Sequence, residues 1–365
     1  MGTMRERVVA AAPFAAAVVA AVLLLMAVVI FVNSRGFGYD YVAYDAAARR
    51  IASGLALYVP GTAEAYARGA YEGLYLYPPP LAIALVPLTF VDERTATLLW
   101  MAMRIGLLVF GCAMLPVRGS VRLLTFAVAC VSYPVLFDLN LGNISIVVFA
   151  LTALAWRLDG RLAGAIVHAV LIAIRFPFGV FVALWLAQRR YLMLMATLVA
   201  GAVLIVLSLP IVGFATYTDY VTILRSLPDI STGEHNLSIG GTVSGLGSTG
   251  PSLAVVTLVG YAFGLGAIVY GGLRRDRDVA FVMTAVATLV VSPFIHPHYL
   301  VLLLLPAALL AERGHWWGLL LPLAGWLPDP VLPFVAPVCL VLLASTRSAS
   351  TTPLPSAPNP AVPAT

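Results

Sequence analysis

The side chains in this sequence that could do acid–base chemistry stand at the ends of long apolar runs. Asp40 follows the first run, in GFGYDYVAYD, and His296 and His298 stand between two later runs, in SPFIHPHYLVLL. Ionisable groups are costly inside a bilayer and are kept there mainly for a function. A partly desolvated carboxylate at the mouth of a membrane cavity can act as a general base toward a hydroxyl group, which makes Asp40 a candidate catalytic residue.

A structural role for Asp40 is the alternative. Aspartate is a common N-cap, because its side chain accepts a hydrogen bond from a free backbone N–H at a helix start. Asp45 has Arg49 at i+4, which predicts an ion pair on the helix surface. Asp40 has no such partner nearby in sequence, so the roles of cap and base both stay open.

His296 and His298 flank Pro297, so their side chains can point in different directions. A polar cap at headgroup depth is the alternative role for His296. His298 opens a predicted helix, residues 299–310, whose free N–H groups and dipole favour an anion such as phosphate. Two histidines at this spacing with no further ligand nearby are not a metal motif, so we expect no metal and no cofactor.

Arg175 lies within an apolar stretch, in AIRFPFG. A charge at that depth costs at least about 2.5 kcal/mol, so it needs an anionic partner. Asp138 would be a structural partner, and a substrate phosphate would be a functional one. Neither is excluded by the sequence.

Uncharged polar side chains could hold sugar hydroxyls or cap helices. Asn143 stands in LGNISI, where a cap is the more common role for such a residue taken alone, and Asn236 and Ser238 stand in HNLSIGG. The candidate substrate-binding residues are Tyr44, Tyr77, Asn143, His235, Asn236, Ser238 and His296.

The composition is that of an all-α polytopic membrane protein. Hydrophobic residues make up 61% of the 365 residues and charged residues 10%, with a mean hydropathy of +0.99. The net charge of +5 comes from arginines in short loops, a positive-inside bias that does not indicate a nucleic-acid surface. The three cysteines lie inside apolar runs, which excludes a disulfide framework. The first run, residues 8–32, is longer than a signal-peptide core and predicts a retained helix.

The arginines predict the orientation, because cytoplasmic loops keep Lys and Arg. The N-terminus should lie inside with the clusters at residues 118–122, 157–161, 188–190, 274–278 and 312–315. This threading places four stretches outside, at residues 33–77, 138–143, 214–250 and 291–298. The first of these keeps four arginines, which goes against the rule. The expected location is the plasma membrane, with the site on the extracytoplasmic face.

Two runs do not fit simple spans. Residues 81–91 are too short to cross, and we expect them to dip in and return or to lie at the interface. Residues 162–187 are interrupted at Arg175 and Pro177 with cytoplasmic flanks, which predicts two half-length helices meeting at an outward-facing tip. Broken helices at depth line cavities, so this break indicates a site. The total is about twelve crossing or half-crossing helices, within a range of about 11–13.

We expect one integral-membrane domain at residues 1–345 and a disordered tail at 346–365, rich in Pro, Ser, Thr and Ala. The first external loop, residues 33–77, carries helical spacing and a stop at Gly54, which predict an interfacial helix. The Tyr-rich stretch after it predicts an aromatic belt at headgroup level.

Taken in order, these segments resemble glycosyltransferase family 87 of the GT-C superfamily. The resemblance extends over about residues 38–306 and departs from the family at two positions: Arg175, where Lys is typical, and His296, where an aromatic residue is common. The matching positions are Asp40, Tyr44, Gly54, Tyr58, YLYPPPLAIALVPL, Leu141, Gly142, Asn143, the Arg175 to Pro177 break, Asn236, Ser238, Ser292, Pro293, His298 and Tyr299.

The resemblance implies a GT-C-like helical bundle with Asp40 as the catalytic base and His298 in contact with the donor phosphate or the acceptor. It implies an enzyme that uses a polyprenyl-phosphate sugar, with mannose the expected sugar and arabinofuranose the alternative, and a lipid or glycan acceptor. We expect Arg175 and His298 to bind the donor phosphate. A lipid or sugar transporter, or a non-enzymatic scaffold, would be the rival classes, since broken helices and buried arginines suit a transporter too.

Overall fold

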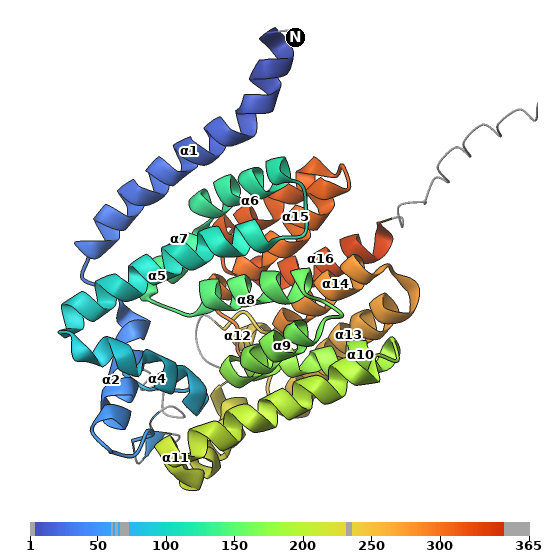
Figure 1. Ribbon diagram of the computed structural model, residues 1–365. Helices are drawn as coiled ribbons and strands as arrows, with labels where there is room; N and C mark the ends of the chain where they lie inside the picture. The colour runs from blue at the N-terminus through green and yellow to red at the C-terminus, as the bar shows by residue number, and fades with distance from the viewer. Residues whose placement is uncertain (1–3, 60, 63–64, 66–72, 231–235, 347–365) are drawn as a thin grey trace, which may run out of the picture.

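The computed structural model describes residues 4–59, 61–62, 65, 73–230 and 236–346, and within them it is built of helices, with no strand. Figure 1 shows the arrangement. The helices are α1 (Met4–Val32), α2 (Tyr39–Ala52), α4 (Pro79–Leu85), η1 (Val86–Phe90), α5 (Glu93–Met114), α6 (Gly119–Val131), α7 (Tyr133–Leu141), α8 (Ser145–Arg157), α9 (Leu162–Ile174), η2 (Phe176–Val180), α10 (Phe181–Ala187), α11 (Tyr191–Ile230), α12 (Ile239–Gly245), α13 (Gly250–Arg274), α14 (Arg277–Val290), η3 (Pro297–Leu303), α15 (Leu304–Glu312), η4 (Trp316–Trp326) and α16 (Leu332–Ser345). The η elements are 3₁₀ helices.

Four helices of the described chain are long and apolar enough to cross a membrane, which confirms the prediction of a polytopic all-α membrane protein. They lie at Ala11–Val32, Glu93–Met114, Tyr191–Arg225 and Gly250–Arg274, and the pair α6 and α7, bent by 60°, makes a fifth. Six further apolar helices have only 10–17 residues. The predicted crossing and half-crossing helices therefore correspond to a few full spans and many short helices.

The segment between residues 162 and 187 folds as the predicted pair of short helices. Helix α9 ends at Ile174, Arg175 is extended (φ −142°, ψ 97°), and α10 follows after the 3₁₀ turn η2. Directly before and after this pair, Asp159 and Arg190 form an ion pair with a 2.5 Å contact. The two ends therefore lie together, as a hairpin that enters and returns on one side requires.

The loops with arginine clusters meet at one end of the bundle. Arg118 pairs with Glu312 at 3.0 Å, and Arg313 pairs with Asp276 at 2.6 Å. Asp159 accepts from both Arg190 and Arg277. All five predicted cytoplasmic clusters thus join one connected end, as the threading predicts.

The short helices run between this arginine end and the opposite end of the bundle. Helix α8 starts near Asn143 and ends at Arg157, α14 starts at Arg277 and leads to Ser292, and the continuous η3–α15 pair runs from Pro297 to Glu312. The described polar residues that were predicted to lie outside therefore gather at the end away from the five arginine clusters.

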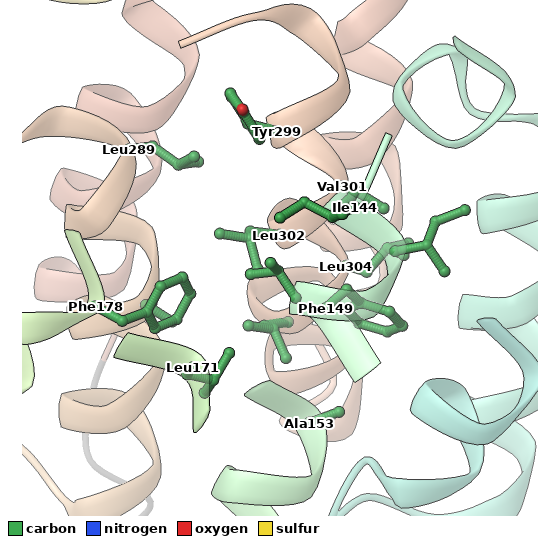
Figure 2. Close-up of a cluster of buried hydrophobic side chains, with 14 of the residues drawn as sticks. Ile144, Phe149, Ala153, Leu171, Phe178, Leu289, Tyr299, Val301, Leu302 and Leu304 are labelled. Atoms are coloured by element: carbon green, nitrogen blue, oxygen red, sulfur yellow. The ribbon is translucent and has the colours of Figure 1, made fainter. Parts of the chain in front are cut away.

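An apolar core separates the two ends. Figure 2 shows side chains from α8, α9, η2, α14 and η3–α15 packed together, with Tyr299 at the upper edge of the cluster. Phe149, Phe178 and Leu304 in it are fully buried. Close packing of this kind holds the helices together through van der Waals contacts and fixes their upper ends relative to one another.

The first loop contains the predicted helix, since α2 ends at Ala52 and Gly54 takes the left-handed conformation (φ +69°). The predicted aromatic belt is wrong for the described tyrosines. Tyr75 is buried, and its ring contacts those of Tyr44, Tyr58 and Tyr77 in the interior. Phenol rings with mutual partners bury more surface there than at a headgroup interface. The predicted tail, 346–365, lies outside the described residues apart from Thr346.

Candidate active site

A cavity of about 600 Å³ opens at the end of the bundle away from the arginine loops. Its walls come from α2, the segment before α4, the α7–α8 connection, the start of η3 and the loop after η4. It is lined by Tyr39, Asp40, Ala43, Tyr44, Gly73, Leu74, Leu76, Tyr77, Tyr133, Phe137, Leu141, Asn143, Phe294, His296, Pro297, His298, Tyr299 and Asp329. Six of the ten predicted site residues line it together: Asp40, Tyr44, Tyr77, Asn143, His296 and His298.

Asp40 is not the cap of α2. The N-cap is Gly38, at φ +78°, and Asp40 lies in the first turn with its carboxylate in the cavity wall. Asn143 Nδ2 donates a 2.7 Å hydrogen bond to Asp40 Oδ2. Burial raises the pKa of Asp40, and the Asn143 hydrogen bond and the Arg104 charge offset part of that rise. A carboxylate with a raised pKa is a stronger base.

Asn143 holds Asp40 and is itself held just before the start of α8. Its Oδ1 accepts from the backbone N–H of Ile144 at 2.7 Å, while its amide nitrogen donates to the carboxylate. Asp138 also holds the same turn in place, because its Oδ2 accepts a hydrogen bond from the Ser145 N–H at 2.8 Å. Asn143 is therefore not the N-cap of α8, which is Ile144, and its amide nitrogen contacts Asp40 instead.

Asp138 pairs with Arg104 of α5, which was not among its predicted partners. The contact is 3.3 Å long and both side chains are fully buried. Arg104 also donates to the backbone carbonyls of Asp138 and Leu139. A buried pair is retained at a desolvation cost, and here its hydrogen bonds fix the end of α7 directly behind the Asp40–Asn143 contact.

Two glycines allow α2 and α7 to meet. Gly142 adopts φ +83°, and a Cβ on it would lie 2.8 Å from Tyr41 Cβ. The Gly38 N–H donates to the Asn140 carbonyl at 2.8 Å. Only a residue without a side chain fits this left-handed position at this distance, so the glycines set how closely Asp40 approaches Asn143.

Both histidines face the cavity, whereas the sequence allowed one of them to face the interface. His298 is 2% exposed, and neither ring nitrogen has a hydrogen-bond partner among the described residues. Its ring lies 4.3 Å from that of Tyr299 and 5.5 Å from that of His296. His296 is the N-cap of η3 without a side-chain cap bond, and its ring packs on Phe294. In the cavity wall, the two His298 ring nitrogens are available to a ligand.

Arg175 lies behind Tyr299 in a smaller adjoining cavity of about 100 Å³. Its guanidinium carbon is 3.4 Å from the centre of the Tyr299 ring, and its side chain is 8% exposed. Among the described residues no carboxylate pairs with it, and Asp138, the structural candidate, is paired with Arg104 instead. Tyr299 and Tyr77, joined by a 3.0 Å hydrogen bond, line both cavities and separate Arg175 from the larger one.

Asn236 and Ser238 lie outside the cavity lining. Asn236 Oδ1 accepts from the N–H groups of Ser238 and Ile295, and its amide donates to the Pro293 carbonyl at 3.0 Å. Ser238 caps α12 through the Gly241 N–H. These side chains hold the 293–295 segment in place, so they support the histidines from behind. His235 lies outside the described residues.

The lining residues that were not predicted as site residues include Tyr133, Phe137 and Asp329. Tyr133 and Phe137 lie four residues apart on α7, a spacing that places them on one face. Asp329 follows η4 in the stretch WLPDPV. Its position between two prolines was the one sequence signal that could have indicated Asp329 as a site residue.

Fold and site together define a membrane protein with an open cavity whose lining holds two carboxylates, Asp40 and Asp329, and two imidazole groups. The model of glycosyltransferase family 87 matches residues 75–293, more than half of the chain. The chain therefore belongs to glycosyltransferase family 87 and is a membrane glycosyltransferase. Comparisons with curated proteins and with solved structures gave no significant match.

The matched region includes Asn143 and Arg175 but begins after Asp40 and ends before His298. The matched region thus contains six of the eighteen cavity-lining residues, and the roles of Asp40 and His298 depend on the geometry described above. Among the described residues, no group of three or more His, Cys, Asp or Glu side chains could hold a metal ion. A metal-independent reaction stays a prediction.

Proposed function

We propose that this protein transfers a hexose, mannose, from a polyprenyl-phosphate donor to a hydroxyl group of a lipid or glycan acceptor, on the extracytoplasmic side of the cell membrane. The observation that carries the proposal is the arrangement of Asp40, His298 and Arg175 around Tyr299. A carboxylate lines one cavity, and next to it lies a buried cation that has no carboxylate partner within the described part of the chain.

In the proposed reaction Asp40 removes the proton of the acceptor hydroxyl. The oxygen attacks the anomeric carbon on the face opposite the phosphate, and the bond from that carbon to the phosphate oxygen breaks with inversion. The polyprenyl phosphate leaves with the electron pair. Cationic and hydrogen-bonding groups near the leaving group lower the barrier because they stabilise its growing negative charge, a role we assign to Arg175 and His298.

The Tyr299 ring must move away from Arg175 when the donor binds if the guanidinium is to contact the phosphate. The guanidinium lies against the ring face, a contact worth about 2 kcal/mol or more when desolvated. A charge-assisted hydrogen bond to phosphate is of similar or greater strength. We therefore propose that the phosphate enters the smaller cavity from the Tyr77–Tyr299 boundary and replaces the ring as the partner of Arg175.

Purified protein in lipid nanodiscs, given polyprenyl-phosphate mannose and envelope lipid extract, tests the proposal. We expect a new mannosyl glycolipid by mass spectrometry. If product forms only with polyprenyl-phosphate arabinofuranose, the donor sugar in the proposal is arabinofuranose and the reaction class stays the same. Movement of the donor across sealed vesicles without a new glycosidic bond would support a flippase and overturn the proposal.

A further inference from the structure

A row of aromatic rings leads from the buried histidine to the protein surface. His298 and Phe137 have ring centres 6.0 Å apart, and Phe137 and Tyr133 stack at 5.2 Å with 12° between their planes. Trp326 lies 5.2 Å from Tyr133 and is 59% exposed. Phe137, Tyr133 and Trp326 are called the aromatic wall below.

The aromatic wall is held in place before any ligand binds. The Trp326 indole N–H donates to the Val131 carbonyl at 3.0 Å. Gly325 lies so close to Pro134 that no Cβ fits there, which fixes the end of η4 on the start of α7. Rings fixed in this way lose little conformational entropy when a ligand stacks on them.

A carboxylate lies in the same part of the cavity. Asp329 follows Trp326 by three residues and lines the cavity together with Tyr133 and Phe137. A sugar ring has one face of C–H groups, which suits an aromatic face, and a rim of hydroxyl donors, which suits a carboxylate with two acceptor oxygens.

The charges at the two ends of the row of aromatic rings favour different substrates, the donor at one end and the acceptor at the other. Arg175 contacts Tyr299 next to His298, so the inner end attracts a phosphate, whereas Asp329 at the outer end repels one. An uncharged sugar ring is therefore the ligand favoured at the outer end. We propose that the aromatic wall and Asp329 form a binding site for a sugar ring of the acceptor. This proposal rests on the proposed function, because only a transferase has an acceptor.

Tryptophan fluorescence of the full chain in lipid nanodiscs tests this site without any turnover, with methyl α-mannopyranoside and methyl β-glucopyranoside as probes. We expect a saturable change with at least one glycoside in the wild type and in Trp317→Phe, a matched variant of an exposed tryptophan of η4. The change should vanish in Trp326→Phe. Its half-saturation concentration should rise about fivefold or more in Tyr133→Ala and Asp329→Asn, as loss of one stacking or hydrogen-bond partner predicts.

The proposal is overturned if neither glycoside gives a saturable change, if glycerol at equal concentration gives the same change, or if Trp326→Phe or Asp329→Asn responds like the wild type. Asp329→Asn keeps the shape of the side chain, so a folding defect in Tyr133→Ala does not decide the result. The transfer assay on the same samples separates the two proposals. Transfer without glycoside binding contradicts this site alone, and glycoside binding without transfer contradicts the proposed function alone.

Discussion

Asn143 Nδ2 lies 2.7 Å from Asp40 Oδ2, a hydrogen bond between side chains 103 positions apart in the chain. It ties the start of α2 to the start of α8 at the wall of the cavity. Because Asn143 is itself held by the Ile144 N–H, the carboxylate points into the cavity from a rigid support. The predictions below depend on this contact and on the cation behind Tyr299.

Asp40→Asn should reduce sugar transfer by about 10²–10⁴-fold, the usual contribution of a general base. Asparagine has the same shape and can still accept the Asn143 hydrogen bond, so the fold should be unchanged. Initial rates in nanodiscs, with thermal unfolding midpoints alongside, measure both. Asp45→Asn is the matched control on α2, since Asp45 pairs with Arg49 away from the cavity lining, and it should keep most of the rate. Wild-type rates for Asp40→Asn would remove the base assignment.

The rate should depend on pH through Asp40. The carboxylate must be deprotonated to act as a base, so activity rises as pH rises through its pKa. Burial raises the pKa of Asp40, so the acid limb of kcat/KM should lie above the ordinary range of an aspartate.

Asn143→Ala should move that acid limb to higher pH. The amide donor favours the charged carboxylate, and its loss raises the pKa of Asp40 further. Asn143→Asp keeps an oxygen for the Ile144 N–H but adds a like charge, so it should move the limb further still. Asn140→Ala is the control. A lower rate with an unmoved pH profile would mean that Asn143 is only structural.

Arg175→Ala should lower kcat/KM for the lipid-phosphate donor by about 10–100-fold, since a hydrogen bond to a charged group contributes about 1.5–3 kcal/mol. The KM for the acceptor should change little. Arg175→Lys keeps the charge and should recover part of the loss. Arg225→Ala, an exposed arginine of α11, is the control. Equal effects on donor and acceptor would argue against phosphate binding by Arg175.

Asp159→Ala should lower the midpoint of thermal unfolding by several degrees at neutral pH and leave the KM values unchanged. Burial alone would raise the pKa of Asp159, but hydrogen bonds from Arg190 and Arg277 hold it below its ordinary range. Its stabilisation is therefore present above the ordinary pKa of aspartate and is lost as pH falls through the lowered value. The wild-type and variant midpoints should converge in acid. Asp219→Ala, at an exposed carboxylate, should match the wild type throughout.

Local signals predicted the elements that carry the site. The stop at Gly54, the break at Arg175 and the i+4 pair of Asp45 with Arg49 each depend on neighbours in sequence, and each is confirmed. The arginine clusters also predicted which loops meet, because one rule applies to all of them.

Contacts between distant segments were not predictable in the same way. Nothing near Arg104 indicates that its partner is Asp138, 34 residues on, because the pairing depends on how α5 crosses α7. Asn236 was expected to meet a sugar, yet its amide bonds backbone groups of residues 293 and 295. An amide side chain has the same sequence signal in both roles.

Gly142 also determines how closely α2 and α7 approach each other. The separation of the two backbones is set by van der Waals contact with Tyr41, so a single added methyl group would act as a wedge. Such a wedge would drive the carboxylate away from its amide donor without altering any polar atom. The alignment of the reaction centre is thus specified partly by the smallest residue in it, and substitutions that look chemically inert would be the ones to disturb it.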